Sequence, residues 1–192
     1  MKKIDLDIFL FDSVLPSDLC EKLYTLGLGM NTAIRLDLIE EDKELFHQFN
    51  KFWIQNIEDE YLNEYLKLYK PEEGIGFTAG NDAVKFLKEY NKTKWRDLFL
   101  LYYNETKLNN GLKNVHWDFS NITMVACLND GYEGGELVFP RQNVFVKLKK
   151  GDIIIFPGGF THPHYVDFIS SGHRIVLVGQ TLFPKQDHKV EY

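Results

Sequence analysis

Three residues of this sequence have the types and spacing of metal ligands. His116 and Asp118 are separated by one residue. On a β-strand, residues two apart project from the same face, so an imidazole nitrogen and a carboxylate oxygen can aim at one point. His164, further along the chain, offers a second imidazole. Two imidazoles and one carboxylate on one side of a metal ion leave its other coordination positions open for chemistry. His116, Asp118 and His164 are therefore candidate ligands of one metal ion.

Spacing by itself does not select these residues. A lone His-x-Asp pattern is a weak signal, and its ordinary explanation is a solvated ion pair at the end of a surface strand. His162 and His173 compete with His164 as the third ligand. His162 has the same strand parity as His164, so the period of two cannot separate them. The surrounding sequence has to supply the distinction.

Motifs around the candidate ligands distinguish His164 from the competing histidines. Residues 164–174 read His-Tyr-Val-Asp-Phe-Ile-Ser-Ser-Gly-His-Arg. They resemble the distal signature of the prolyl 4-hydroxylase-like branch of the 2-oxoglutarate/Fe(II)-dependent dioxygenases, His-x-Val-x-Pro-Val-x-x-Gly-x-Arg. Residues 128–140 are similar to the family's Leu-Asn followed by Gly-Gly-x-Leu-x-Phe, and residues 151–156 to its Gly-Asp-x-x-x-Phe. Residues 11–20 look like the strand and helix that open these domains. Arg174 falls on the arginine of the family signature only when His164 is aligned with its histidine.

The resemblance implies a set of cofactors and residue roles. Fe(II) would be held by His116, Asp118 and His164, and Arg174 would bind the far carboxylate of the cosubstrate 2-oxoglutarate. A planar guanidinium suits a carboxylate bidentately, whereas an ordinary strand arginine would pair with an acidic side chain. Tyr103, in a Tyr-Asn sequence like that of the family, would contact the cosubstrate, with Tyr102 as the alternative. O2 would be consumed, and ascorbate is the candidate reductant.

The expected reaction is hydroxylation, and a prolyl residue in a peptide or protein is the leading substrate. The alternative substrate is a free amino acid or another small molecule. Three departures from the family pattern change the substrate side of the expected pocket: Phe168 replaces its proline, Cys127 a tyrosine and Gln180 an aromatic residue. The aromatic side chains of a peptide groove would come from Tyr102, Trp117 and Tyr165, and the loops at 72–80 and 104–114 could close over it. Thr123 is a further candidate for the pocket lining.

Two other functional classes fit part of the pattern. A jelly roll that binds a metal or ligand without turnover would need only some of these residues, whereas all three ligands are present. A zinc hydrolase could use the same ligands, but it lacks an evident general base and leaves Arg174 unexplained.

The elements that must position these residues follow from periodicity and turn signals. Strands are predicted at residues 4–11 and 32–39, a helix from Ser17 or Asp18 to about Gly27, one or two amphipathic helices over 41–68, and a short helix over 81–90. Asp18 and Glu21 have the spacing of a capping box. Short strands then follow at 98–103, 122–128, 136–139, 144–148, 153–156, around His164, and at 175–181.

This pattern predicts an α+β protein with a mainly β core, and the resemblance implies the double-stranded β-helix, or jelly roll. The 192 residues are expected to form one domain, with residues 1–96 as mostly helical support and 97–184 as the jelly-roll core.

The net charge of −6 argues against bulk binding of nucleic acid or of an anionic membrane. Cys20 and Cys127 lack metal or redox spacing and are expected to be buried free thiols. The first residues contain no long apolar run, so no signal peptide or membrane span is expected, and an intracellular, cytoplasmic location is predicted. The oligomeric state stays open.

Overall fold

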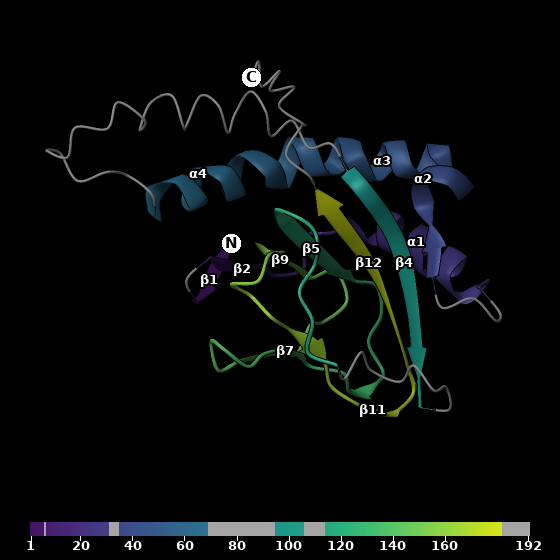
Figure 1. The fold of residues 1–192 in the computed structure, drawn as a ribbon. Coiled ribbons are helices and arrows are strands. Elements are labelled where there is room, and N and C mark those ends of the chain that lie inside the picture. Colours follow the sequence, from purple (N-terminus) through teal and green to yellow (C-terminus); the bar gives the residue numbers. More distant parts are fainter. Residues whose placement is uncertain (6, 31–34, 69–94, 106–113, 182–192) are drawn as a thin grey trace, which may run out of the picture.

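In the part of the chain that the structure describes, the main sheet has seven antiparallel strands. The computed structural model describes residues 1–5, 7–30, 35–68, 95–105 and 114–181. Within these ranges the strand order of the sheet is β1-β2-β9-β5-β12-β4-β3 (Figure 1). The strands are β1 (Lys2–Asp5), β2 (Ile8–Phe11), β3 (Arg35–Asp37), β4 (Trp95–Asn104), β5 (Ile122–Cys127), β9 (Ile153–Pro157) and β12 (His173–Thr181).

Alternate residues of these strands form two buried faces. On β4, Leu98 and Leu100 pack on one face, whereas Phe99 and Tyr103 pack on the other. The strands β5, β9 and β12 divide their residues in the same way, as the period of two requires. Because both faces are apolar, each needs a covering layer.

Helices cover the first face. They are α1 (Ser17–Leu28), α2 (Leu38–Glu41), α3 (Lys43–Trp53), the π-helix η1 (Ile54–Glu58) and α4 (Asp59–Leu68). Figure 1 shows α3 and α4 running across the end of the sheet at which β4 begins and β12 ends, whereas α1 packs on β4 and β12, and α2 packs on β4. The aromatic stripe of the predicted 41–68 helix is part of the core, because Phe49, Phe52 and Trp53 are buried against this face.

Two small sheets cover the second face. In one, β7 (Leu137–Phe139) lies between β10 (Tyr165–Val166) and β8 (Val144–Val146), and in the other β6 (Glu133–Gly134) pairs with β11 (Ile169–Ser171). Leu137, Val166 and Ile169 join the same apolar cluster as Val176 and Val178 of β12. The space between the main sheet and these small sheets contains the candidate site.

Three local predictions at the N-terminal end were wrong in detail. The expected strand at 4–11 is a hairpin of β1 and β2, with Asp7 at a left-handed φ of 63° between them. In the expected strand at 32–39, residues 38 and 39 already belong to α2, because the Asp37 carboxylate accepts a 2.9 Å hydrogen bond from the Ile39 amide and so caps the helix. Helix α1 follows Pro16 without any side-chain cap, so the capping box of Asp18 is not formed.

The first 96 residues contribute more than helices, since β1, β2 and β3 belong to the main sheet. The predicted helix at 81–90, the loop at 72–80 and most of the loop at 104–114 lie outside the described residues. Cys20 and Cys127 are buried and free, as predicted. No helix in the described ranges is long and apolar enough to cross a membrane.

Candidate metal centre and ligand cavity

A pair of backbone hydrogen bonds joins the two candidate histidine ligands. The His116 amide donates to the His164 carbonyl at 3.0 Å, and the His164 amide donates back to the His116 carbonyl at 2.8 Å. This isolated antiparallel bridge holds the two imidazole rings with their centroids 4.6 Å apart. The parity argument assumed strand geometry for His116 and Asp118, but among the described residues of that segment only His116 forms a bridge, and no regular strand is formed there. The two side chains nevertheless lie on the same side.

The same two histidines have their tautomers set by backbone carbonyls. Nδ1 of His116 lies 2.9 Å from the Asn114 carbonyl, and Nδ1 of His164 lies 3.0 Å from the His162 carbonyl. A carbonyl oxygen can only accept a hydrogen bond, so each Nδ1 carries the proton. Nε2 of each neutral ring is then left with its lone pair, which is the arrangement that metal-binding histidines use.

Asp118 is held from two sides. Its amide donates to the Gly158 carbonyl at 2.7 Å, and its Oδ2 accepts a 2.6 Å hydrogen bond from the Thr123 hydroxyl. Oδ2 also lies 3.6 Å from Nε2 of His164. One ligand atom from each of His116, Asp118 and His164 lies within 4.8 Å of the others, which is a spacing that one metal ion can bridge.

Burial lowers the pKa of the His164 imidazole, and the nearby Asp118 carboxylate partly offsets this effect. The ring is therefore neutral near pH 7. His162 is not a member of the three-residue group, and its Nδ1 lies 3.0 Å from the hydroxyl of Thr161. Strand parity left His162 and His164 equivalent, whereas the bridge to His116 places only His164 at the group.

A cavity of about 270 Å³ opens between the main sheet and the sheet of β7 and β10. This volume is close to the lower end for small-molecule sites, roughly 300 Å³. The metal-ligand candidates lie in its wall, and alternate residues of β12 line it from Arg174 to Gln180. The described lining consists of Phe99, Leu101, Tyr103, His116, Asp118, Thr123, Val125, Leu137, His164, Val166, Arg174, Val176, Val178 and Gln180.

Arg174 is the unusual residue of this lining. Its side chain is 1% exposed, and none of its three guanidinium nitrogens has a hydrogen-bond partner among the described residues. The guanidinium lies 5.7 Å from the centre of the Tyr103 ring. Tyr132 is also near, but its hydroxyl donates to the Leu148 carbonyl at 3.0 Å. A buried cation without an anion is costly, so the cavity has the charge and the donors to accept an anionic ligand.

Tyr103, the predicted cosubstrate contact, lines the same cavity and is 2% exposed. Burial raises the pKa of its hydroxyl to about 12, although Arg174 acts in the opposite direction. The phenol is therefore protonated at neutral pH and can donate a hydrogen bond. Tyr102 lies on the other face of β4, where its ring stacks on His173 with centroids 5.7 Å apart. The structure thus brings Tyr103 to the cavity and not Tyr102.

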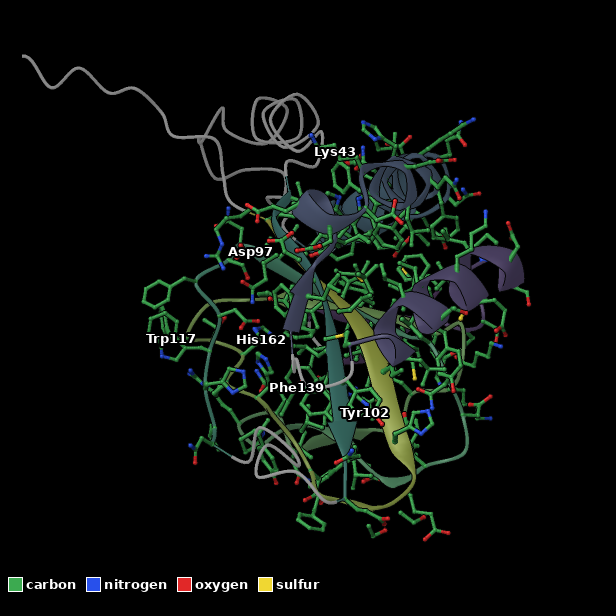
Figure 2. All side chains as sticks on the ribbon, turned by 90° about the vertical axis from the view of Figure 1, so that its right-hand side faces the viewer. Lys43, Asp97, Tyr102, Trp117, Phe139 and His162 are labelled. Carbon is green, nitrogen blue, oxygen red and sulfur yellow. The ribbon has the colours of Figure 1, made fainter. Side chains whose placement is uncertain are left out.

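The aromatic side chains predicted for a peptide groove do not belong to this cavity. Tyr102, Trp117 and Tyr165 are all missing from the described lining of the cavity. Trp117 lies at the outer edge of the molecule (Figure 2), where it is 45% exposed and contacts Phe119. Of the three departures from the family pattern, Gln180 alone lines the cavity: Cys127 is buried beside Tyr132, and Phe168 is 44% exposed.

Several supporting contacts could not be predicted from sequence. They include the carbonyls that set the histidine tautomers, the Gly158 carbonyl behind Asp118, and the hydrogen bond from Arg96 to Gln180. A partial signal existed for Gly158, because Pro157-Gly158-Gly159 directly follows a strand and marks a turn.

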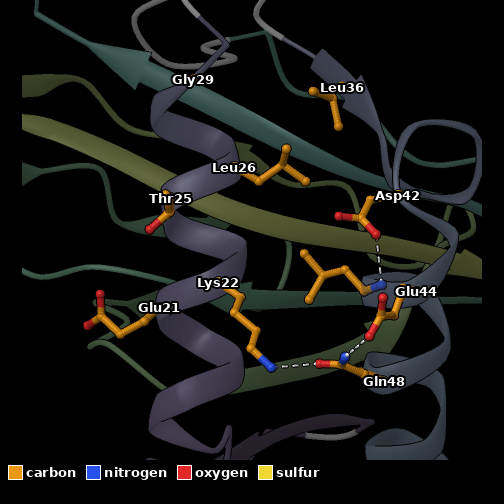
Figure 3. A pocket seen from close by; sticks show the side chains of 10 residues that line it. Glu21, Lys22, Thr25, Leu26, Gly29, Leu36, Asp42, Glu44 and Gln48 are labelled. Atoms are coloured by element: carbon orange, nitrogen blue, oxygen red, sulfur yellow. Dashed lines mark hydrogen bonds between the residues drawn. The ribbon is translucent and has the colours of Figure 1, made fainter.

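A larger hollow lies elsewhere, on the helical side of the protein. Its volume is about 730 Å³. Figure 3 shows this space between α1 and α3, where Gln48 links Lys22 to Glu44 through hydrogen bonds. It contains no histidine or cysteine and no buried unpaired charge among its described lining residues. The smaller cavity therefore contains the side chains that could bind a metal ion and an anionic ligand, although its volume is lower.

The fold of the described chain is that of solved prolyl hydroxylases. A viral collagen prolyl hydroxylase from Paramecium bursaria Chlorella virus-1, solved as a 2-oxoglutarate (2OG) complex, matches with a TM-score of 0.60 at 17% identity, covering 91% of this chain and 94% of that one. A prolyl hydroxylase of Trichoplax adhaerens, in complex with a hypoxia inducible factor peptide fragment, matches with a TM-score of 0.55 at 12% identity, covering 92% and 84%.

Sequence comparison points to the same class over a shorter stretch. A PKHD-type hydroxylase of Prochlorococcus marinus (strain AS9601) is 45% identical over 62 residues, which are 31% of this chain and 27% of that relative. No family model matches the sequence. Together, the fold and the related stretch confirm the resemblance of this chain to the prolyl 4-hydroxylase-like 2-oxoglutarate/Fe(II) oxygenases.

Proposed function

We propose that the protein is an Fe(II)- and 2-oxoglutarate-dependent hydroxylase that acts on a prolyl residue in a peptide or protein. One observation carries the proposal. A buried, unpaired guanidinium and a group of two histidines and an aspartate line the same small cavity. A metal site alone would not need Arg174, whereas a dicarboxylate that reaches from the metal to a distant cation needs both.

The residues present fit both groups. His116, Asp118 and His164 would hold Fe(II), since two imidazoles whose Nδ1 atoms face carbonyl oxygens, together with one carboxylate, suit a non-haem Fe(II) site. Thr123 and the Gly158 carbonyl would keep the Asp118 carboxylate in position. When bound, iron and 2-oxoglutarate would couple the reduction of O2 to hydroxylation of the substrate, with succinate and CO2 as the other products.

The remaining cavity residues would bind and orient the cosubstrate. Arg174 would donate to one carboxylate of 2-oxoglutarate from a site that excludes water, where charge-assisted hydrogen bonds are strong. The Tyr103 hydroxyl would donate to the same ligand. Apolar residues on β12, Val176 and Val178, would enclose the carbon chain.

The finer assignments of fold and substrate belong to the same proposal. The two-layer arrangement around the cavity supports a double-stranded β-helix, and the chain would form one domain. Prolyl hydroxylation is supported by the names of the matching proteins, one of which was solved with a peptide fragment. Ascorbate is proposed as the reductant.

Metal and cosubstrate binding test this proposal before any substrate is known. Mn(II), an inert substitute, should bind at one ion per chain, and 2-oxoglutarate should bind only to the Mn(II)-loaded protein. His164→Ala should abolish Mn(II) binding, whereas His162→Gln should retain it. Binding of Mn(II) by His164→Ala but not by His162→Gln would reject the assignment.

Turnover is measured by succinate formation with Fe(II), ascorbate and 2-oxoglutarate. Product mass on proline-rich peptides, beside free proline and other amino acids, then identifies the substrate. A gain of one oxygen only on free amino acids would reject the prolyl-peptide assignment and leave the hydroxylase assignment intact.

A further inference from the structure

We infer that Gln180 is a specificity-determining residue, whose side-chain amide donates a hydrogen bond to a peptide-type carbonyl beside the carbon that is hydroxylated. The inference rests on the proposed hydroxylase function. It adds a residue that recognises the substrate and a chemical reason for a peptide rather than a free amino acid.

Gln180 lies at the metal end of the cavity. It is 8% exposed, lines the cavity, and is the cross-strand neighbour of Thr123 on β5. Thr123 in turn donates to the Asp118 carboxylate. Arg174 is on the same face of β12 but six residues earlier, which is about 20 Å along a strand. A ligand held by Arg174 therefore leaves Gln180 beside the opposite end, where a substrate would meet the metal.

The orientation of the Gln180 amide is set by Arg96 on β4. The Arg96 guanidinium donates to Gln180 Oε1 and to the Phe119 carbonyl, and its Nε lies 2.6 Å from Oδ2 of Asp97. A guanidinium has only donors, so the atom of Gln180 that faces it must be the oxygen. The two N–H donors of Nε2 are then not engaged by Arg96, on a side chain that lines the cavity.

This donor is neutral, which identifies the acceptor that it suits. The positive charge of Arg96 is engaged by Asp97 and two oxygen atoms, and Arg96 does not line the cavity. Among the described lining residues, Arg174 is the one guanidinium, and it lies at the far end. No lysine, and no arginine other than Arg174, is among the described lining residues, so no cationic side chain would pair with the carboxylate of a free amino acid at this end, whereas a peptide brings a neutral carbonyl that a neutral N–H donor matches. Phe99 and Val125 provide apolar surface for the rest of the residue.

The test uses two variants that remove the donors in different ways. Gln180→Glu keeps the length of the side chain and an oxygen for Arg96 but has no N–H group. Gln180→Met removes the donors without adding a charge. Gln48→Met is the matched control, because Gln48 makes its hydrogen bonds on the helical side of the protein (Figure 3). The probes are a random-sequence peptide library with acetylated and amidated ends, and a mixture of the free amino acids.

Stimulation of succinate formation by each probe is measured over the substrate-free background, together with 2-oxoglutarate binding to the Mn(II)-loaded protein and the melting temperature. We expect the peptide library, and not the free amino acids, to stimulate the wild-type protein. Both Gln180 variants should need about 3- to 15-fold more peptide for half-maximal stimulation, as expected for one lost hydrogen bond. Their affinity for 2-oxoglutarate should stay within about twofold of wild type, and Gln48→Met should match wild type throughout.

The outcomes separate the inference from the function on which it rests. Three results would overturn the role of Gln180 if 2-oxoglutarate still binds. They are stimulation by free amino acids alone, no stimulation by either probe, and a wild-type response of Gln180→Met to the peptides. A wild-type protein that neither binds nor consumes 2-oxoglutarate would instead overturn the proposed function, and the inference with it.

Discussion

The hydroxyl of Thr123 donates a 2.6 Å hydrogen bond to Oδ2 of Asp118, and it lies 2.8 Å from the hydroxyl of Ser120. Thr123 is 1% exposed, so water cannot replace this contact. The contact restrains the one carboxylate of the candidate metal group. Residues that orient a ligand in this way typically change metal affinity by roughly 10- to 100-fold when they are replaced.

Thr123→Val should therefore weaken Mn(II) binding by about 10-fold or more, because valine keeps the shape of threonine but cannot donate. Calorimetric titration with Mn(II) measures the effect. Thr181→Val is the matched control, since the Thr181 hydroxyl makes a long 3.5 Å hydrogen bond to the Ile122 carbonyl and Thr181 does not line the cavity. Equal Mn(II) affinities in the two variants would show that the Thr123 contact does not orient Asp118.

Two adjacent glycines provide a second test of the support behind Asp118. A Cβ atom at Gly158 would lie 2.7 Å from the Ser120 carbonyl and 2.9 Å from the Thr123 hydroxyl, and closer still to the Ser120 hydroxyl. At Gly159 a Cβ atom would meet nothing within 4 Å. Gly158→Ala should therefore lower the free energy of unfolding by about 1–3 kcal/mol and weaken Mn(II) binding. Gly159→Ala should do neither. Denaturant unfolding with Mn(II) titration compares the two variants, and similar behaviour would contradict the described turn.

Replacing Arg174 by methionine should separate binding from stability. The buried guanidinium has no hydrogen-bond partner among the described residues, so Arg174→Met should leave the ligand-free protein at least as stable as wild type. A saturating ligand at 100 times its Kd stabilises a protein by about 2.7 kcal/mol, which is roughly 5–10 °C in Tm at this size. With Mn(II) present, 2-oxoglutarate should raise the Tm of wild type by this amount and leave that of Arg174→Met unchanged. An equal rise in both proteins would remove Arg174 from the ligand site.

The thiol of Cys20 should be chemically inert in the folded protein. Burial raises the pKa of Cys20 to about 11, although Lys150 acts in the opposite direction, and its Sγ lies 3.3 Å from the Leu128 carbonyl. The reactive thiolate is the form lost when a pKa rises, so at pH 8 its fraction is about 100-fold lower than in an ordinary thiol. Iodoacetamide labelling followed by mass spectrometry should show slow modification in the native protein and fast modification in urea. Fast native labelling that disappears in Cys20→Ser would contradict this.

Much of the architecture was readable from local pattern. Apolar residues with a period of three to four predicted the helices at 41–68, and apolar runs between turn residues predicted the strands. The same reasoning failed at residues 38 and 39, where alternation predicted a strand and the Asp37 cap started a helix. A capping contact of one residue competes directly with a weak alternation, and local pattern does not say which prevails.

The sequence alone determined which residue types are available for the site: two histidines and an aspartate in a recognisable order, an arginine ten residues after the second histidine, and a tyrosine before the metal motif. Only the tertiary structure decided where they lie. The backbone bridge to His116 places His164 in the three-residue group, the two faces of β4 bring Tyr103 and not Tyr102 to the cavity, and Arg96 orients the amide of Gln180. Parity along a strand is a local property, whereas which histidine pairs with His116, and which face of a strand meets a cavity, depends on contacts between segments far apart in the chain.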